Sequence, residues 1–132
     1  MKTILAFSIA TAFIWTITAL GAPATAVSLR GVFIWSNEGG QKHQLDAKLT
    51  PTGTNEWHAV WNFDWKQRPV TFTGTVKGSL QNGPVTGTGD STDGRRRFTF
   101  VGTAKDGAIT FEHYEVTHGK NRTGTGELRT AN

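Results

Sequence analysis

Residues 85–115 read VTGTGDSTDGRRRFTFVGTAKDGAITFEHYE, and two turn signals divide this stretch into three short segments. The signals are Asp93-Gly94 and Asp106-Gly107, because a two-residue hairpin turn needs residues that accept a positive φ. Apolar and polar residues alternate on both sides of each turn. Alternation with a period of two is typical of strands with one buried face, so the stretch predicts an antiparallel sheet.

Each turn also predicts which residues lie opposite one another. The expected pairs across the first turn are Gly89 with Phe98, Gly87 with Phe100 and Val85 with Gly102; across the second they are Ala104 with Ile109, Gly102 with Phe111, Phe100 with His113 and Phe98 with Glu115. All of these pairs keep the apolar residues on one face. Because a slip of one residue would move a whole strand to the other face, turn chemistry and alternation support the same register.

Three further turns extend this register in both directions. Asn82-Gly83 is another hairpin signal, and short turns are expected at Gln67-Arg68 and near Gly119-Lys120. The expected pairs are Leu80 with Val85, Gly78 with Gly87 and Val76 with Gly89; then Trp65 with Val70, Phe63 with Phe72, Trp61 with Gly74 and Trp57 with Gly78; and finally Glu115 with Gly124, His113 with Gly126 and Phe111 with Leu128.

The alternation continues through segments 28–36, 42–50 and 55–65 and ends at 122–130, which makes eight strands in sequence order. An open meander would leave two exposed edges, and pairing the last strand with the first removes both. The sequence therefore predicts an all-β, eight-stranded antiparallel up-and-down barrel, with a two-sheet β-sandwich as the alternative. The side chains expected inside are Trp57, Trp61, Phe63, Phe72, Phe100 and Phe111.

Composition narrows the class of protein. The chain of 132 residues has 16 glycines and no cysteine, and residues 27–132 are long enough for one small domain. The lack of cysteine excludes disulfides, thiol catalysis and cysteine-ligated zinc. The net charge of +4 is too diffuse to indicate a nucleic-acid partner.

The first 26 residues predict export. Lys2 precedes an apolar run from Ile4 to Leu20, and Ala24-Thr25-Ala26 matches the small-x-small pattern of a cleavage site. We interpret residues 1–26 as a secretory signal peptide, with an uncleaved membrane anchor as the alternative. The expected location is secreted or periplasmic, and after cleavage no membrane association is expected.

The chain resembles avidin- and lipocalin-type barrels in its architecture. The resemblance rests on the signal peptide, the start Leu29-Arg30-Gly31, the eight-strand meander and the inward tryptophans. The lipocalin motif Gly-x-Trp is not met, since Gly31 and Trp35 are four residues apart, and no biotin-contacting motif can be placed on the chain. The resemblance therefore implies the fold of these families and not biotin binding.

The predicted register gathers an aromatic-walled cup at one end of the barrel, where loops 37–41, 66–69, 92–95 and 118–121 meet. Its candidate ligand-binding residues are Trp35, His43, Phe63, Trp65, Phe98, His113 and Glu115. His113 and Glu115 are also weak catalytic candidates, with solvated rim residues as the alternative interpretation. Arg95-Arg96-Arg97 is interpreted as a solvated cluster, with Arg97 opposite Asp90 on the outer face.

Three functions fit these features. The first is a non-catalytic binding protein for a small apolar or aromatic ligand. The second is a module that binds through its outer surface, such as an inhibitor of another exported protein or an envelope component. The third is a small-barrel isomerase or cyclase that uses His113 with Glu115 for proton transfer. The sequence has no metal-ligand spacing and no phosphate loop, so no metal or cofactor is expected.

Overall fold

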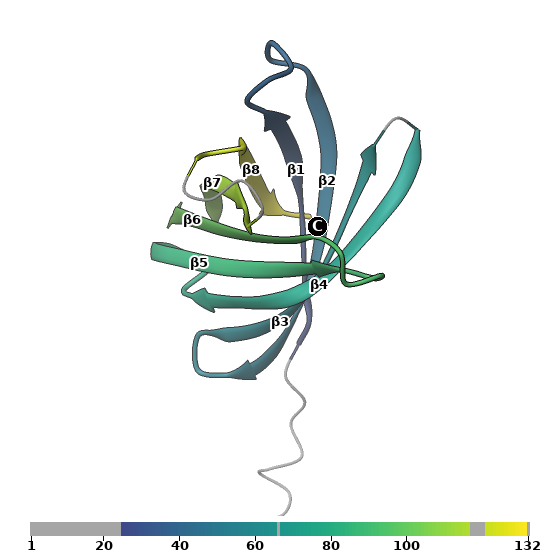
Figure 1. Ribbon diagram of the computed structural model, residues 1–132. Helices are drawn as coiled ribbons and strands as arrows, with labels where there is room; N and C mark the ends of the chain where they lie inside the picture. The colour runs from purple at the N-terminus through teal and green to yellow at the C-terminus, as the bar shows by residue number, and fades with distance from the viewer. Residues whose placement is uncertain (1–24, 66, 117–120, 132) are drawn as a thin grey trace, which may run out of the picture.

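The computed structural model describes residues 25–65, 67–116 and 121–131, and it shows eight strands joined by short connections (Figure 1). Their bounds are β1 Val27–Trp35, β2 Lys42–Gly53, β3 Glu56–Trp65, β4 Arg68–Gly78, β5 Asn82–Ser91, β6 Arg97–Lys105, β7 Ala108–Glu115 and β8 Gly124–Thr130. No helix in this part of the chain is long and apolar enough to cross a membrane. The expected signal peptide at 1–26 lies outside the described residues, except for Thr25 and Ala26.

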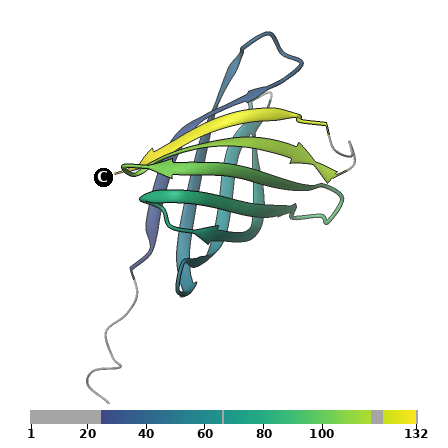
Figure 2. The same ribbon diagram turned by 90° about the vertical axis from the view of Figure 1, so that its left-hand side faces the viewer.

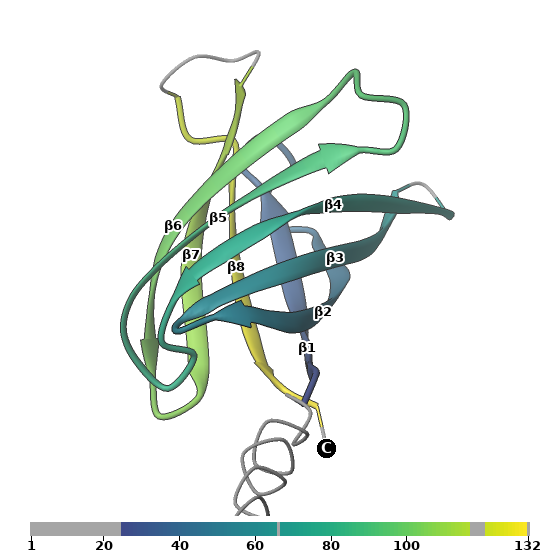
Figure 3. The ribbon, with the colours of Figure 1, turned by 90° about the horizontal axis from the view of Figure 1, so that it is seen from below.

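The sheet closes on itself. Each strand pairs with the next along the chain, and β8 pairs with β1 from Leu29 opposite Thr130 to Trp35 opposite Gly124. Figures 2 and 3 show the strands wrapping around a common interior, with the end of β8 beside the start of β1. The structure confirms the eight-stranded antiparallel barrel and excludes the two-sheet sandwich.

Two of the predicted hairpins have the expected register. All pairs expected across Asp93-Gly94 and across Asp106-Gly107 are present. Asp106 and Gly107 both have a positive φ, of 51° and 81°, as a type I′ turn requires. On the outer face Asp90 lies opposite Arg97 as predicted, and the two side chains form an ion pair.

The other three hairpins are each shifted by two residues from the prediction. Val85 lies opposite Gly78 rather than Leu80, because β4 ends at Gly78, which has a φ of +124°. Residues 79–81 form the connection, where the Ser79 hydroxyl accepts hydrogen bonds from the backbone N–H groups of Gln81 and Asn82. Asn82-Gly83 belongs to β5 and pairs with β6, so this dipeptide is not the turn.

The remaining two shifts have the same form. Trp61 pairs with Phe72 and Trp65 with Arg68, and Gln67, in the connection between β3 and β4, has a φ of +65°. His113 pairs with Gly124 across β7 and β8; residues 117–120 of that connection lie outside the described part. A slip of two residues keeps each side chain on its predicted face, so the core is predicted correctly although these registers are wrong.

The interior is filled by side chains of the predicted inward face. Trp61, Phe72, Phe100 and Phe111 are at most 6% exposed, while Trp57 and Phe63 are partly buried against them. Large rings lie against inward glycines of neighbouring strands, and a Cβ added at Gly87 would overlap the ring of Phe100. The glycines therefore provide the space that the rings occupy.

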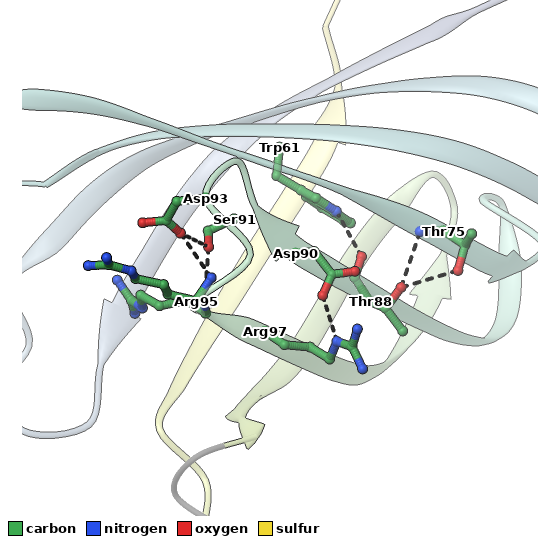
Figure 4. A network of polar contacts seen from close by, with 9 residues as sticks. Trp61, Thr75, Thr88, Asp90, Ser91, Asp93, Arg95 and Arg97 are labelled. Atoms are coloured by element: carbon green, nitrogen blue, oxygen red, sulfur yellow. Dashed lines mark hydrogen bonds and ion pairs between the residues drawn. The ribbon is translucent and has the colours of Figure 1, made fainter.

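The pairing of β4 with β5 has an irregular stretch near Gly74. Regular pairing is interrupted at Gly74 and Thr75, and the Thr88 side chain replaces part of the ladder: its hydroxyl accepts the Thr75 N–H at 3.3 Å. The Thr88 carbonyl accepts the Trp61 indole N–H at 3.2 Å, as Figure 4 shows. A Cβ at Gly74 would overlap this same carbonyl group, so the strands meet here more closely than any other residue allows.

We expect Gly74→Ala to lower the free energy of unfolding by about 2–3 kcal/mol, because the added methyl group must push two strand backbones apart. The matched control is Gly53→Ala, where the added Cβ would lie 3.4 Å from the flexible end of Glu56. Urea unfolding of both variants measures the difference. Equal stability of the two variants would contradict the close-approach argument.

Candidate functional site

A small apolar chamber lies inside one end of the barrel, beneath the connections β1–β2, β3–β4 and β5–β6. We call this the mouth end. The chamber has a volume of about 30 Å³, and its walls are mainly aromatic. The lining residues are Phe33, Trp35, Leu45, Trp61, Phe63, Phe72, Phe98 and Phe111, with Arg96, His113 and Glu115 as the polar members. It holds a few water-sized molecules and lies where the sequence predicts the cup.

Arg96 closes this chamber toward solvent. Its guanidinium donates to the carboxylate of Glu115, and the two side chains are 42% and 5% exposed, respectively. The guanidinium carbon also lies 5.8 Å from the centre of the Trp35 ring and 5.7 Å from that of Phe72. The interpretation of Arg96 as part of a solvated cluster is therefore wrong. Arg96 lies two residues before the inward-facing Phe98, and its side chain lines the chamber.

The connection before β6 holds the Arg96 backbone firmly. Ser91 N–H donates to the Arg96 carbonyl, and Arg96 N–H donates to the Ser91 hydroxyl, both at 2.9 Å. That hydroxyl donates to Asp93, which also accepts the backbone N–H of Arg95 at 2.9 Å (Figure 4). The Arg95 N–H and then the Ser91 hydroxyl hold the pKa of Asp93 below its usual value. A rigid loop thus presents a long, partly exposed side chain.

Thr123 positions His113. The Thr123 hydroxyl donates to the His113 carbonyl at 3.0 Å and accepts the Glu115 N–H at 3.0 Å. His113 Nδ1 lies 2.8 Å from the same oxygen. The Thr123 hydroxyl therefore contacts both the backbone and the ring of His113 and fixes the position of the imidazole. Thr123 was missed by the sequence analysis, since no local pattern brings it to this strand.

The imidazole of His113 is neutral at physiological pH. The residue is 6% exposed and packs edge-on against Phe33 and Trp35. Burial, followed by the positive charge of Arg96, lowers the pKa of His113 to about 4. The rim interpretation of His113 and Glu115 is therefore wrong, because both side chains are buried.

His113 and Glu115 have different partners, so they do not form the acid–base pair considered from sequence. The Glu115 carboxylate binds Arg96, and the His113 ring binds Thr123. The geometry therefore provides a neutral imidazole and a carboxylate compensated by a guanidinium. In the described ranges, no three His, Asp or Glu side chains gather to hold a metal ion.

Five of the seven candidate ligand-binding residues line the chamber: Trp35, Phe63, Phe98, His113 and Glu115. His43 does not; its Nε2 lies 3.0 Å from a carboxylate oxygen of Glu38, and it lines a separate shallow depression outside. Trp65 ends β3, and its side chain lies outside the described part.

A wider depression of about 400 Å³ lies directly outside the chamber. Its lining residues are Trp35, Ser36, Asn37, Arg96, Glu115, Asn121, Arg122 and Thr123. Trp35, Arg96 and Glu115 line both spaces. These three side chains therefore form the boundary between the chamber and the outer depression, and Arg96 is the charged one that extends from a loop.

Comparison with known proteins adds information on the fold alone. No protein-family model matches the chain, and no curated protein matches its sequence. A similar solved structure is a de novo designed fluorescence-activating β-barrel, with a TM-score of 0.55 and 18% identity over 86% of this chain and 97% of that chain. At this identity the likeness supports the barrel architecture and transfers no site residue.

We expect His113→Asn to make the protein more resistant to mild acid. Above pH 6.5 the histidine is neutral in both states and adds no pH dependence. Between pH 6.5 and 4 the unfolded chain takes up a proton that the buried ring does not, so the wild type loses up to about 3 kcal/mol of unfolding free energy. Asn keeps a side-chain N–H for Thr123 and does not titrate.

Urea unfolding of both proteins at pH 7.5, 5.5 and 4.5 tests this prediction. As the pH falls, the free energy of unfolding should decrease more for the wild type than for His113→Asn. The carboxylates are the same in both proteins, so their contributions cancel in the comparison. Parallel pH profiles would show that His113 titrates normally in the folded protein.

Proposed function

We propose that this protein is a non-catalytic binding protein for a small, partly aromatic ligand held at the mouth end. The observation that carries the proposal is the arrangement of two adjoining spaces, an aromatic chamber and an outer depression, with Trp35, Arg96 and Glu115 lining both of them. Ligand sites commonly combine apolar walls with a few convergent polar groups. The polar groups here are Arg96, His113 and Glu115.

The size of the chamber requires that Arg96 moves when a ligand enters. A volume of about 30 Å³ holds water and not a ring, whereas ligand sites typically measure about 300–1,000 Å³. The outer depression of about 400 Å³ is within that range. Once Arg96 turns outward, the chamber, the vacated space and the depression become one site, with the apolar part of the ligand innermost.

Two further parts of the proposal come from sequence. The features of residues 1–26 support export to a secreted or periplasmic location, and the domain then begins at β1. The eight-stranded barrel resembles avidin- and lipocalin-type barrels in architecture, as the sequence predicts. The designed neighbour is described as fluorescence-activating, which is compatible with small-ligand binding by a barrel of this shape.

The nearly filled interior also favours a second candidate, a module that binds an exported protein through its outer surface. A depression crosses β1, β6, β7 and β8 on the outside, where Val32, Ile34 and Val101 contribute apolar side chains. Val101 is 55% exposed. This surface makes the outer face the alternative place of binding.

A neutral single-ring probe distinguishes the two candidates. We expect benzyl alcohol to bind with a dissociation constant on the order of 1 mM, because one small ring is buried. Leu45→Phe should weaken binding at least about tenfold by filling the chamber, at a cost in stability of about 1–3 kcal/mol. Val101→Ser on the outer face should leave binding unchanged.

Saturation-transfer NMR with benzyl alcohol measures these affinities, and circular dichroism checks that each variant is folded. Loss of binding in Val101→Ser together with retention in Leu45→Phe would place the site on the outer face. If benzyl alcohol fails to bind the wild type, this part of the proposal is wrong for neutral ligands.

A further inference from the structure

We propose that the ligand is a small organic cation, an amidinium, guanidinium or ammonium group on an apolar body, which binds by replacing the Arg96 guanidinium at the Glu115 carboxylate. This inference rests on the proposed function, because it assumes that the chamber and the outer depression form the site. It goes further in naming the charge of the ligand and the residue that recognises it.

The first argument is the position of Glu115. It is the only acidic residue that is buried among those the structure describes, and it lies at the boundary of the chamber and the depression. A buried carboxylate is costly unless a cation and hydrogen bonds compensate it. The site therefore requires a positive charge at this position whether or not a ligand is bound.

The second argument is the surroundings of the Arg96 guanidinium. It lies within 6 Å of the ring centres of Trp35 and Phe72, at 5.8 and 5.7 Å, while it binds the carboxylate. A carboxylate beside two aromatic rings is a favourable place for a planar cation. Arg96 thus shows which chemical group fits the site.

The third argument is the difference in exposure between the two partners. The Arg96 side chain is 42% exposed and extends from a surface loop, whereas Glu115 is 5% exposed. If the pair opens, Arg96 turns into water and is hydrated, but Glu115 stays buried and needs a new partner. This asymmetry favours a cationic ligand over a neutral or anionic one.

Two other arginines near the mouth, among the residues that the structure describes, have carboxylate partners other than Glu115. Arg97 is paired with Asp90, and Arg122 lies 3.7 Å from a Glu112 carboxylate oxygen. His113 adds no positive charge near neutral pH, because burial lowers its pKa to about 4. In the described part of the chain Arg96 is the cation paired with Glu115, so it is the one that a cationic ligand must displace.

Three probes of nearly the same shape test the charge: benzamidine (+1), benzamide (neutral) and benzoate (−1). Isothermal titration at pH 7.5 on the wild type and on Arg96→Met, Glu115→Gln and Arg95→Met measures their affinities. Arg96→Met removes the internal competitor, so benzamidine should bind about tenfold or more tightly than to the wild type. Glu115→Gln should abolish benzamidine binding, and the matched control Arg95→Met should behave as the wild type.

A measurement on the wild type keeps the test valid if a variant fails to fold. The Nε–Hε NMR signal of Arg96 should move to the position of a solvated arginine on addition of benzamidine, and not on addition of benzamide. Benzamidine binding that leaves this signal in place would overturn the displacement.

The remaining outcomes separate this inference from the proposed function. Equal affinity for benzamide and benzamidine would overturn the requirement for a cation while keeping a small-ligand site. Tight binding of benzoate that is lost in Arg96→Met would make Arg96 the anchor of an anionic ligand, again overturning only the inference. If none of the three probes nor benzyl alcohol binds, both proposals fail.

Discussion

Closure of the barrel depends on the packing of large aromatic rings against glycine residues on the inward face. Eight strands of this length leave little interior volume, and the aromatic side chains fill it by lying against glycines of neighbouring strands, as Phe100 does against Gly87. At Gly74 the strands approach so closely that side-chain hydrogen bonds of Thr88 and Trp61 replace part of the backbone ladder. The barrel closes by pairing β8 with β1, and closure leaves no sheet edge exposed.

This packing also determines where a site is possible. Rings fill the barrel below the chamber, and the mouth end is where buried polar groups occur: Glu115, His113 and the Arg96 guanidinium that reaches them. Each of these groups has a defined hydrogen-bond partner in the structure. The partner of Glu115 is the exposed one, and an ion pair with one solvated member can open at lower cost than a fully buried pair.

Several parts of this arrangement could be predicted from sequence because side chains alternate strictly along a strand. Alternation places the side chains of Phe98, His113 and Glu115 on the inward face. The register errors of two residues at three hairpins do not change this face, because side chains two residues apart point the same way. The same rule would have placed Arg96 inside, two residues before Phe98, if the run of three arginines had been considered by phase and not as one charged cluster. His43 shares the phase but lies beyond the chamber, next to Glu38.

By itself the sequence determined the fold class, the order of the strands, the inward face and the general location of the cup, because alternation and turn chemistry are local properties. Only the tertiary structure decided that the chamber is small, that Glu115 binds Arg96 and not His113, and that Thr123 lies against the His113 ring. These features depend on distances between strands that are far apart in sequence. Alternation along one strand, with its period of two residues, does not encode those distances.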